Sequence, residues 1–288
     1  MRWSSGDRGN IEDVRGASGG GFPAIPLGIG GLIIVALLSM YTGIDFFSLL
    51  GGGQVDAPSS TVGTSGSVSS SPTEEKLVDF VDAVAEDVQS TWGNVLGPRY
   101  QRTRVTLFRD QIQSACGFAQ SATGPFYCPR DHKVYLDLGF FDELQRRFGA
   151  PGDFAQAYVL AHEFGHHVQA LTGTESRLRE PQRENPSAAN ALSVRLELQA
   201  DCYAGVWGHS AAQPGRATQG KVELEAGDVD EGLRAAAAIG DDRLQKMAAG
   251  RVMPERFTHG SSEQRVSWFK RGLESGDPRA CDTFSMTR

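Results

Sequence analysis

The segment "VLAHEFGHHVQALTG", Val159 to Gly173, decides the fold because it can be read as a helix that carries a metal site. It contains the pattern H-E-x-x-H, in which His162 and His166 are four residues apart and project from one helix face. Both imidazoles can then reach one zinc ion at about 2.1 Å. Glu163 lies one step round the helix, where it can act on a water at the metal. His167, five positions after His162, points elsewhere and is not predicted to be a ligand.

The helix is predicted over residues 153–172, with Asp153 as its N-cap and Gly173 as its C-terminal stop. A surface helix with incidental histidines could show the same motif. A catalytic zinc site also requires a third protein ligand. The remaining sequence therefore has to supply one.

A second helix, which carries two acidic residues on one face, meets this requirement. Asn185-Pro186 predicts a helix start, and that helix carries "LELQADCYAGVW", Leu196 to Trp207. Glu197 and Asp201 share one face of it. We expect Glu197 to be the third ligand and Asp201 to accept the free N–H of a ligating imidazole. A solvated acidic face is less compatible with the apolar flanks, so the sequence predicts a His2Glu site for Zn2+.

The rest of the domain mixes helix and strand patterns. Ser71 to Glu74 resembles a capping box with Pro72 at the first helical position. Runs at 104–108, 124–128 and 133–138 read as strands, the last two as a hairpin, and the pattern from Phe140 onward is helical. The predicted fold class is α+β and mostly helical, with a small β-sheet, in one domain over residues 73–288.

The N-terminal part has a different composition. No charged residue occurs between Gly16 and Ile44, and 27–44 would span about 27 Å as a helix. We expect a cytoplasmic tail at 1–24, one transmembrane helix at 25–44 and a Gly/Ser-rich linker at 45–72. The main alternative is a cleaved signal peptide, whose apolar region would be shorter. Arginines precede the span and no basic residue follows before Lys76. This asymmetry predicts a single-pass protein of the cytoplasmic (inner) membrane, with its N-terminus inside and the domain outside.

Charge and cysteines agree with an exported domain. The formal net charge of -7 argues against a nucleic-acid partner. Four cysteines and no C-x-x-C pair favour disulfides over a thiolate metal site. Proximity favours Cys116–Cys128, which leaves Cys202–Cys281.

Four blocks of the sequence together resemble a known family. They are "GPFYCPRDHKVYLDL", "YVLAHEFGHHVQ", "LELQADCYAGVWGH" and "ERFTHGSSEQRVSWFKRGLESGD". H-E-x-x-H followed by E-x-x-x-D looks like the gluzincin arrangement. More narrowly, the blocks resemble the bacterial "putative neutral zinc metallopeptidase" family. The resemblance implies a zincin-like peptidase domain behind one membrane span, acting on a peptide or protein substrate.

The chemistry that follows is zinc-dependent hydrolysis. We expect Glu163 to act as general base and His259, just before a helix start at Ser261, to face the developing oxyanion. A structural role for His259 stays open, and Tyr127 and Tyr135 are weaker candidates for the oxyanion. Two alternatives remain: a non-catalytic zinc-binding or interaction domain, and a zinc hydrolase of a cell-wall amide bond.

Overall fold

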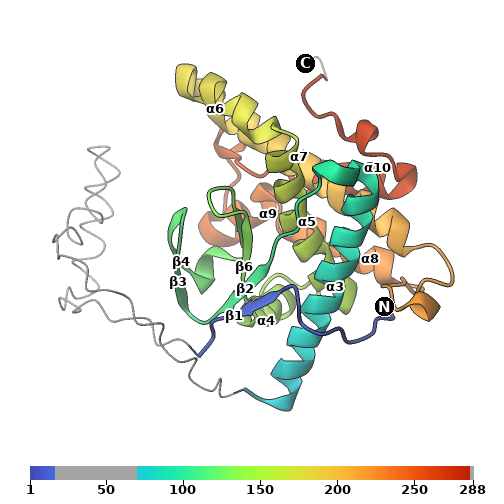
Figure 1. Cartoon of the computed structure of the whole chain (residues 1–288). Coiled ribbons are helices and arrows are strands. Elements are labelled where there is room, and N and C mark those ends of the chain that lie inside the picture. Colours follow the sequence, from blue (N-terminus) through green and yellow to red (C-terminus); the bar gives the residue numbers. More distant parts are fainter. Residues whose placement is uncertain (17–69, 286–288) are drawn as a thin grey trace, which may run out of the picture. The chain divides into compact units, whose positions relative to one another are not determined.

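The computed structural model describes residues 1–16 and 70–285, and these form a mostly helical domain with two small sheets (Figure 1). Its helices are α3 (Pro72–Leu96), α4 (Gly139–Arg146), α5 (Asp153–Leu171), α6 (Thr174–Glu184), α7 (Pro186–Ala211), α8 (Asp228–Ala238), α9 (Asp241–Ala249) and α10 (Ser262–Ser275). Its strands are β1 (Ile11–Asp13), β2 (Val105–Phe108), β3 (Gln111–Ser114), β4 (Gly117–Gln120), β5 (Phe126–Cys128) and β6 (Lys133–Asp137).

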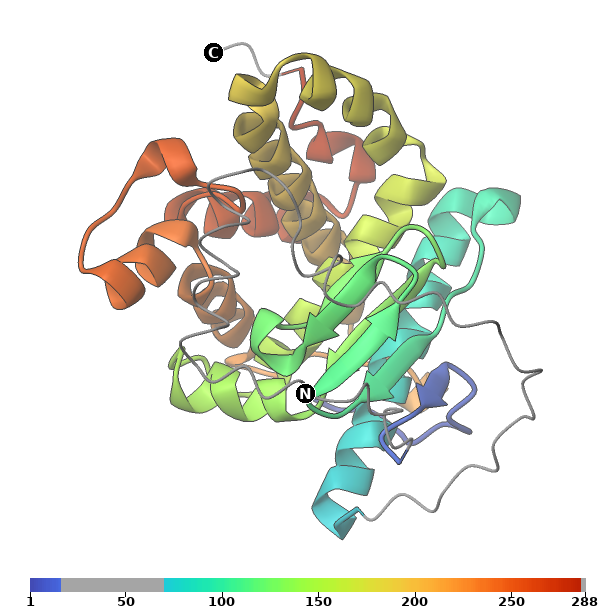
Figure 2. The ribbon, with the colours of Figure 1, turned by 90° about the vertical axis from the view of Figure 1, so that its left-hand side faces the viewer.

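The larger sheet has the strand order β1-β2-β6-β5. The three strands β1, β2 and β6 run parallel, whereas β5 is antiparallel to β6 and forms one edge. The expected hairpin between the last two predicted strands is therefore confirmed. The smaller sheet, β3 with β4, and strand β1 are not anticipated from the sequence because they are short and lack a regular apolar alternation. Figure 2 shows these strands in front of the helices.

Helix α5 lies at the centre of the domain and packs against α3, α7 and α8. Its residues are buried over almost its full length, as expected for a helix that is apolar around its circumference. Helix α3 starts as predicted, because the hydroxyl of Ser71 accepts the backbone N–H of Glu74. The large side chains that fill the core include Trp92, Phe154 and Trp207, none of which is exposed.

The start of α5 differs from the prediction. The N-cap position is Gly152, with φ 119°, and Asp153 is the first helical residue. Capping comes from another helix, since the carboxylate of Glu231 on α8 accepts the backbone N–H of Phe154 at 3.2 Å. A tertiary contact thus replaces the local cap.

The N-terminal residues pack into the domain instead of forming a free tail. Residues 1–15 belong to the same compact unit as the domain, and β1 pairs with β2. Arg15 has a side chain only 1% exposed and forms ion pairs with Asp13, Glu74 and Glu75. Docking therefore uses Arg15, one of the arginines from which the membrane orientation is predicted.

The predicted single-pass membrane arrangement is wrong. Arg15 and Ser70, which lie on either side of residues 17–69, both bond to Glu75, at 3.0 and 2.5 Å, so the described residues before and after that range meet. One passage through a membrane would separate them by about 30 Å. Within 1–16 and 70–285, no helix is both long and apolar enough to cross a membrane. The expected transmembrane helix, 25–44, and most of the expected linker lie outside the described residues.

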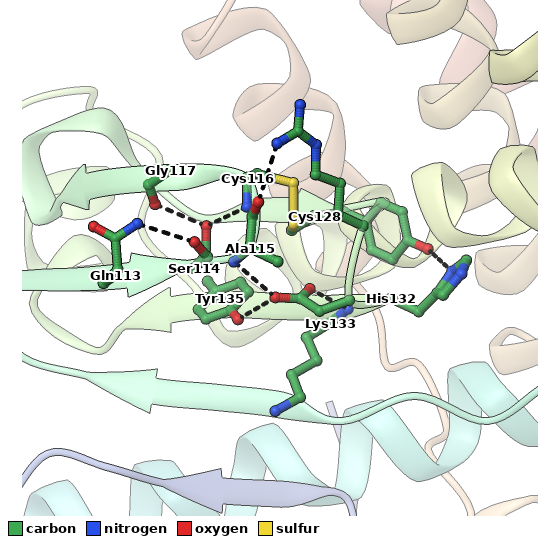
Figure 3. Close-up of a disulfide and its surroundings, with 12 residues drawn as sticks. Gln113, Ser114, Ala115, Cys116, Gly117, Cys128, His132, Lys133 and Tyr135 are labelled. Carbon is green, nitrogen blue, oxygen red and sulfur yellow. Dashed lines mark hydrogen bonds between the residues drawn. A yellow bond between two sulfur atoms is a disulfide. The ribbon is translucent and has the colours of Figure 1, made fainter. Parts of the chain in front are cut away.

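Both favoured disulfides are present, Cys116–Cys128 and Cys202–Cys281. Figure 3 shows the first, which ties the β3–β4 turn to the end of the edge strand β5. The carboxylate of Asp131 supports the same turn by accepting the N–H of Ala115 and the hydroxyl of Tyr135. The second disulfide joins α7 to the C-terminal turn Pro278–Cys281.

Candidate metal centre

Two helices bring the three predicted ligands together. His162 and His166 come from α5 and Glu197 from α7, and their donor atoms all lie within 4.8 Å of one another. The two Nε2 atoms are 3.2 Å apart. The Glu197 carboxylate lies 3.1 Å from Nε2 of His162 and 3.5 Å from Nε2 of His166.

This donor set fits zinc. A tetrahedral ion with bonds of about 2.1 Å requires its ligand atoms to be about 3.4 Å apart. The two Nε2 atoms are 3.2 Å apart, and they lie 3.1 and 3.5 Å from the Glu197 carboxylate, each from a different one of its two oxygens. All three side chains thus approach one another to near this spacing. Two imidazoles and one carboxylate also leave one tetrahedral position open, the pattern of catalytic zinc sites.

A close approach of the two helices sets these distances. Gly165, between the two histidines, lies against Ala200 of α7, and a Cβ at Gly165 would be 2.9 Å from the carbonyl oxygen of Ala200. Such a contact is shorter than side chains tolerate. The glycine therefore lets α7 approach closely enough for Glu197 to reach the histidines.

Each of the two candidate imidazoles is oriented through its Nδ1. Nδ1 of His162 lies 2.8 Å from Asp201, which was predicted for this role. Asp201 is fully buried and also accepts two hydrogen bonds of 2.9 Å from Arg265 and one from the hydroxyl of Tyr158. Nδ1 of His166 lies 2.8 Å from Oε1 of Gln169. Both Nε2 atoms are left facing the site.

Burial and charge shift the pKa values of the ligands. Burial disfavours the charged form of His162, but Asp201 and Glu197 outweigh it and raise its pKa to about 10. Burial also opposes the charge on Glu197, yet His166 and His162 hold its pKa well below the usual range. The candidate ligands thus carry opposite charges that stabilise one another, and a metal ion that binds the imidazoles competes with protons for them.

The general-base candidate Glu163 lies in the same cleft, which has a volume of about 570 Å³. Its side chain is buried, and burial raises its pKa against the opposing effect of His162 and His166. The backbone of Tyr127, on the edge strand β5, hydrogen-bonds to Glu163 and lowers its pKa. A carboxylate with a raised pKa near a metal site is suited to exchange protons with a substrate.

The three residues predicted to face the oxyanion, His259, Tyr127 and Tyr135, differ in their positions and hydrogen-bond partners. His259 lines the cleft, and Asp241 accepts its backbone N–H at 2.7 Å and lies 3.3 Å from its Nδ1. The carboxylate of Asp241 raises the pKa of His259. The hydroxyl of Tyr127 is engaged by His132 and His167, and Tyr135 bonds to Asp131 and is not among the residues that line the cleft.

Sequence reasoning missed several residues that support the site, namely Tyr158, Gln169, Asp241 and Arg265. Gln169 and Tyr158 lie on the motif helix, three positions after His166 and four before His162, so helical spacing alone could have suggested them. Asp241 and Arg265 act across the fold, and no local pattern marks them.

The comparisons with known proteins give one family. A family model described as "Putative neutral zinc metallopeptidase" matches residues 1–284. The chain is 48% identical over 299 residues to "Uncharacterized protein YpfJ" of Escherichia coli (strain K12), with 100% of both chains covered. It is 46% identical over 209 residues to "Uncharacterized protein Rv2575" of Mycobacterium tuberculosis, covering 71% of this chain and 70% of that one. No solved structure matches.

Proposed function

We propose that this chain, which belongs to the neutral zinc metallopeptidase family named above, is a zinc-dependent hydrolase that cleaves peptide bonds. The observation that carries the proposal is the meeting of three ligand atoms and Glu163 in one cleft. A module that only binds zinc does not require a carboxylate such as Glu163 beside the ligands.

His162, His166 and Glu197 would hold the ion. Bound zinc supplies Lewis acidity, which lowers the pKa of water toward about 7 and polarises a carbonyl oxygen. Glu163 accepts a proton from the attacking water on a carboxylate oxygen and passes it to the leaving nitrogen. Its burial in the cleft keeps competing solvent away from that oxygen.

His259 donates a hydrogen bond from its imidazole to the oxygen on which negative charge develops. Asp241 orients the ring and favours its protonated form, so the donor is already aligned when the substrate binds. This role gives Asp241 a function at the site although it does not reach the substrate itself.

The shape of the cleft supports an extended peptide as substrate. The edge strand β5 lines it through Phe126 and Tyr127 and offers backbone groups for strand addition. The lining of the cleft includes large apolar side chains from α4, α5, α8 and α9 and their ends: Phe140, Phe148, Val159, Ile239 and Leu244. We expect cleavage next to a bulky apolar residue.

The test is a comparison of wild-type protein with Glu163→Gln on a peptide library, with zinc content measured in parallel. General-base catalysis contributes about 100- to 10,000-fold, so we expect hydrolysis to fall by that factor while zinc is retained. Glu143→Gln, at the exposed rim of the same cleft, is the matched control and should stay active. Unchanged hydrolysis in Glu163→Gln would refute the mechanism, and zinc binding without hydrolysis of any peptide by the wild type would refute the function.

A further inference from the structure

Two buried glutamines connect the ligand His166 to the C-terminal disulfide. Gln169 on α5 is 1% exposed and Gln199 on α7 is 6% exposed. Gln169 donates to Oε1 of Gln199 at 3.2 Å, and Gln199 donates to the backbone carbonyl of Cys281 at 2.9 Å. Starting from Nδ1 of His166, the bonds run through both amides and end at a residue of the Cys202–Cys281 disulfide.

Two backbone carbonyls fix the direction of every hydrogen bond in this series. Gln169 also donates to the carbonyl of Leu196 at 2.7 Å. A carbonyl oxygen can only accept, so the NH2 group of each amide must face its carbonyl and each Oε1 must face the other way. Oε1 of Gln169 therefore points at His166. The reverse orientation would place two acceptors against each other in the interior, which is costly.

This orientation determines which nitrogen of His166 carries the proton. An acceptor at Nδ1 requires Nδ1–H, and the lone pair is then on Nε2, the atom that faces His162 and Glu197. Asp201 has the same effect on His162 because a carboxylate is also only an acceptor. The tautomers of the two histidines are thus set by separate partners, the charged carboxylate of Asp201 for His162 and the neutral amide of Gln169 for His166.

The end of this hydrogen-bond series, at the carbonyl of Cys281, is held firmly. Cys281 is fully buried and covalently joined to Cys202 on α7, the residue that follows Asp201. Beyond it, the hydroxyl of Thr283 donates to the carbonyl of Arg195 at 2.7 Å. These contacts keep the Cys281 carbonyl in place as the acceptor for Gln199.

We propose that Gln169 and Gln199 form an amide relay, which holds His166 in its metal-binding tautomer and is anchored by the Cys202–Cys281 disulfide. Both glutamines are positioning residues. The proposal rests on the proposed zinc site, but it concerns the retention of the metal and not the hydrolysis of peptides.

The first test measures the zinc dissociation constant by competition with a chelator. Removal of a hydrogen-bond partner of a metal ligand weakens binding by about 10- to 100-fold, and we expect this loss in Gln169→Leu. Gln169→Glu keeps an acceptor for Nδ1 but sets its second oxygen against the carbonyl oxygens of Leu196 and Gln199, so it should recover affinity relative to the leucine variant only in part. Gln213→Leu, at an exposed glutamine just beyond α7, is the matched control and should bind zinc like the wild type.

The second test asks whether Gln199 acts through Gln169. Gln199→Leu should weaken zinc binding by a smaller factor, and the double variant should bind no more weakly than Gln169→Leu alone. The visible absorption of the cobalt-substituted protein should change in Gln169→Leu, since it reports the geometry at the ligands. Exchange of Cys202 and Cys281 for alanine should weaken zinc binding in the same direction as Gln199→Leu, which leaves the disulfide intact.

Wild-type zinc affinity and an unchanged cobalt spectrum in Gln169→Leu would overturn the proposal. If Gln199→Leu reduced zinc affinity by the same factor in the wild type and in Gln169→Leu, Gln199 would not act through Gln169. This result would overturn the relay. Failure of the proposed function has a different signature, because the wild type would then hold zinc and cleave no peptide.

Discussion

At the scale of single residues, Glu197 supplies the only carboxylate oxygen in the set of three donors that meets on α5 and α7 among the described residues. The two histidines are fixed to each other by their spacing on one helix, whereas Glu197 reaches them from another. The ligand that completes the site is thus also the one that depends on the packing of two elements.

We expect Glu197→Ala to lose zinc. Two imidazoles alone leave half of the tetrahedral sites without a protein ligand, so the loss should exceed the about 10- to 100-fold effect of losing a hydrogen-bond partner of a ligand. Elemental analysis of purified protein measures it, with Glu143→Ala as a control from the cleft rim. One zinc per chain in Glu197→Ala would show that this residue is not a ligand.

Arg265 shows why some residue roles could not be foreseen. It is 2% exposed and forms a bidentate pair with Asp201, at 2.9 Å for both bonds. The buried carboxylate would otherwise be costly to keep ionised beside His162. Nothing in the residues around Arg265 on α10 points to a partner on α7, 64 positions earlier.

At the scale of elements, the site depends on how closely α5 and α7 approach. Gly165 is the contact point, with Ala200 on the other side. Helix axes separate when a side chain is added at such a point, because the interior is densely packed. The glycine within the H-E-x-x-H motif is thus a spacer between elements.

We expect Gly165→Ala to weaken zinc binding and to destabilise the fold by about 1–3 kcal/mol, the usual cost of overpacking. Gly93→Ala on α3 is the control, since a Cβ there meets only Tyr100 at 3.9 Å and alanine favours a helix. Chemical denaturation and chelator competition measure the two effects. A Gly165→Ala protein with wild-type zinc affinity would show that the spacing of α5 and α7 is not critical.

At the scale of the whole molecule, the N-terminal residues complete the domain. Arg15 and Arg8 pair with acidic residues at the start of α3, and the side chain of Asn10 donates to Asp82 at 3.0 Å. The basic residues that suggested a membrane orientation are neutralised within the fold.

We expect Arg15→Leu to lower the free energy of unfolding by about 1–3 kcal/mol, because it removes charged hydrogen bonds from three partly exposed carboxylates. Hydrogen bonds from Ser70, Arg8 and Arg15 lower the pKa of Glu75 to about 2. A carboxylate whose pKa is lowered by folding stabilises the folded state above its unfolded pKa near 4. This stabilisation is lost as the pH falls toward 2. Urea unfolding between pH 7 and 2 should therefore show a smaller acid effect in Arg15→Leu. Equal curves for both proteins would argue against docking through Arg15.

Local patterns predicted much of the helical part. The helix start at Ser261 is present and is closed by a capping box with Gln264, and the strand pair β5–β6 and both disulfides are present too. The patterns failed at the N-terminus, where β1 has three residues and pairs with β2, which lies more than ninety positions later in the chain. Short strands gain their stability from partners and not from their own sequence.

The sequence by itself determined the chemistry of the candidate site. Residue type and helical spacing are local properties, and they sufficed to place two imidazoles and a carboxylate base on one helix and to name Glu197 as their partner. Tertiary structure alone decided what surrounds that set. The amide relay, the pairing of Arg265 with Asp201 and the docking of residues 1–15 join residues far apart in the chain. Their contacts form only when the buried groups find partners that replace water.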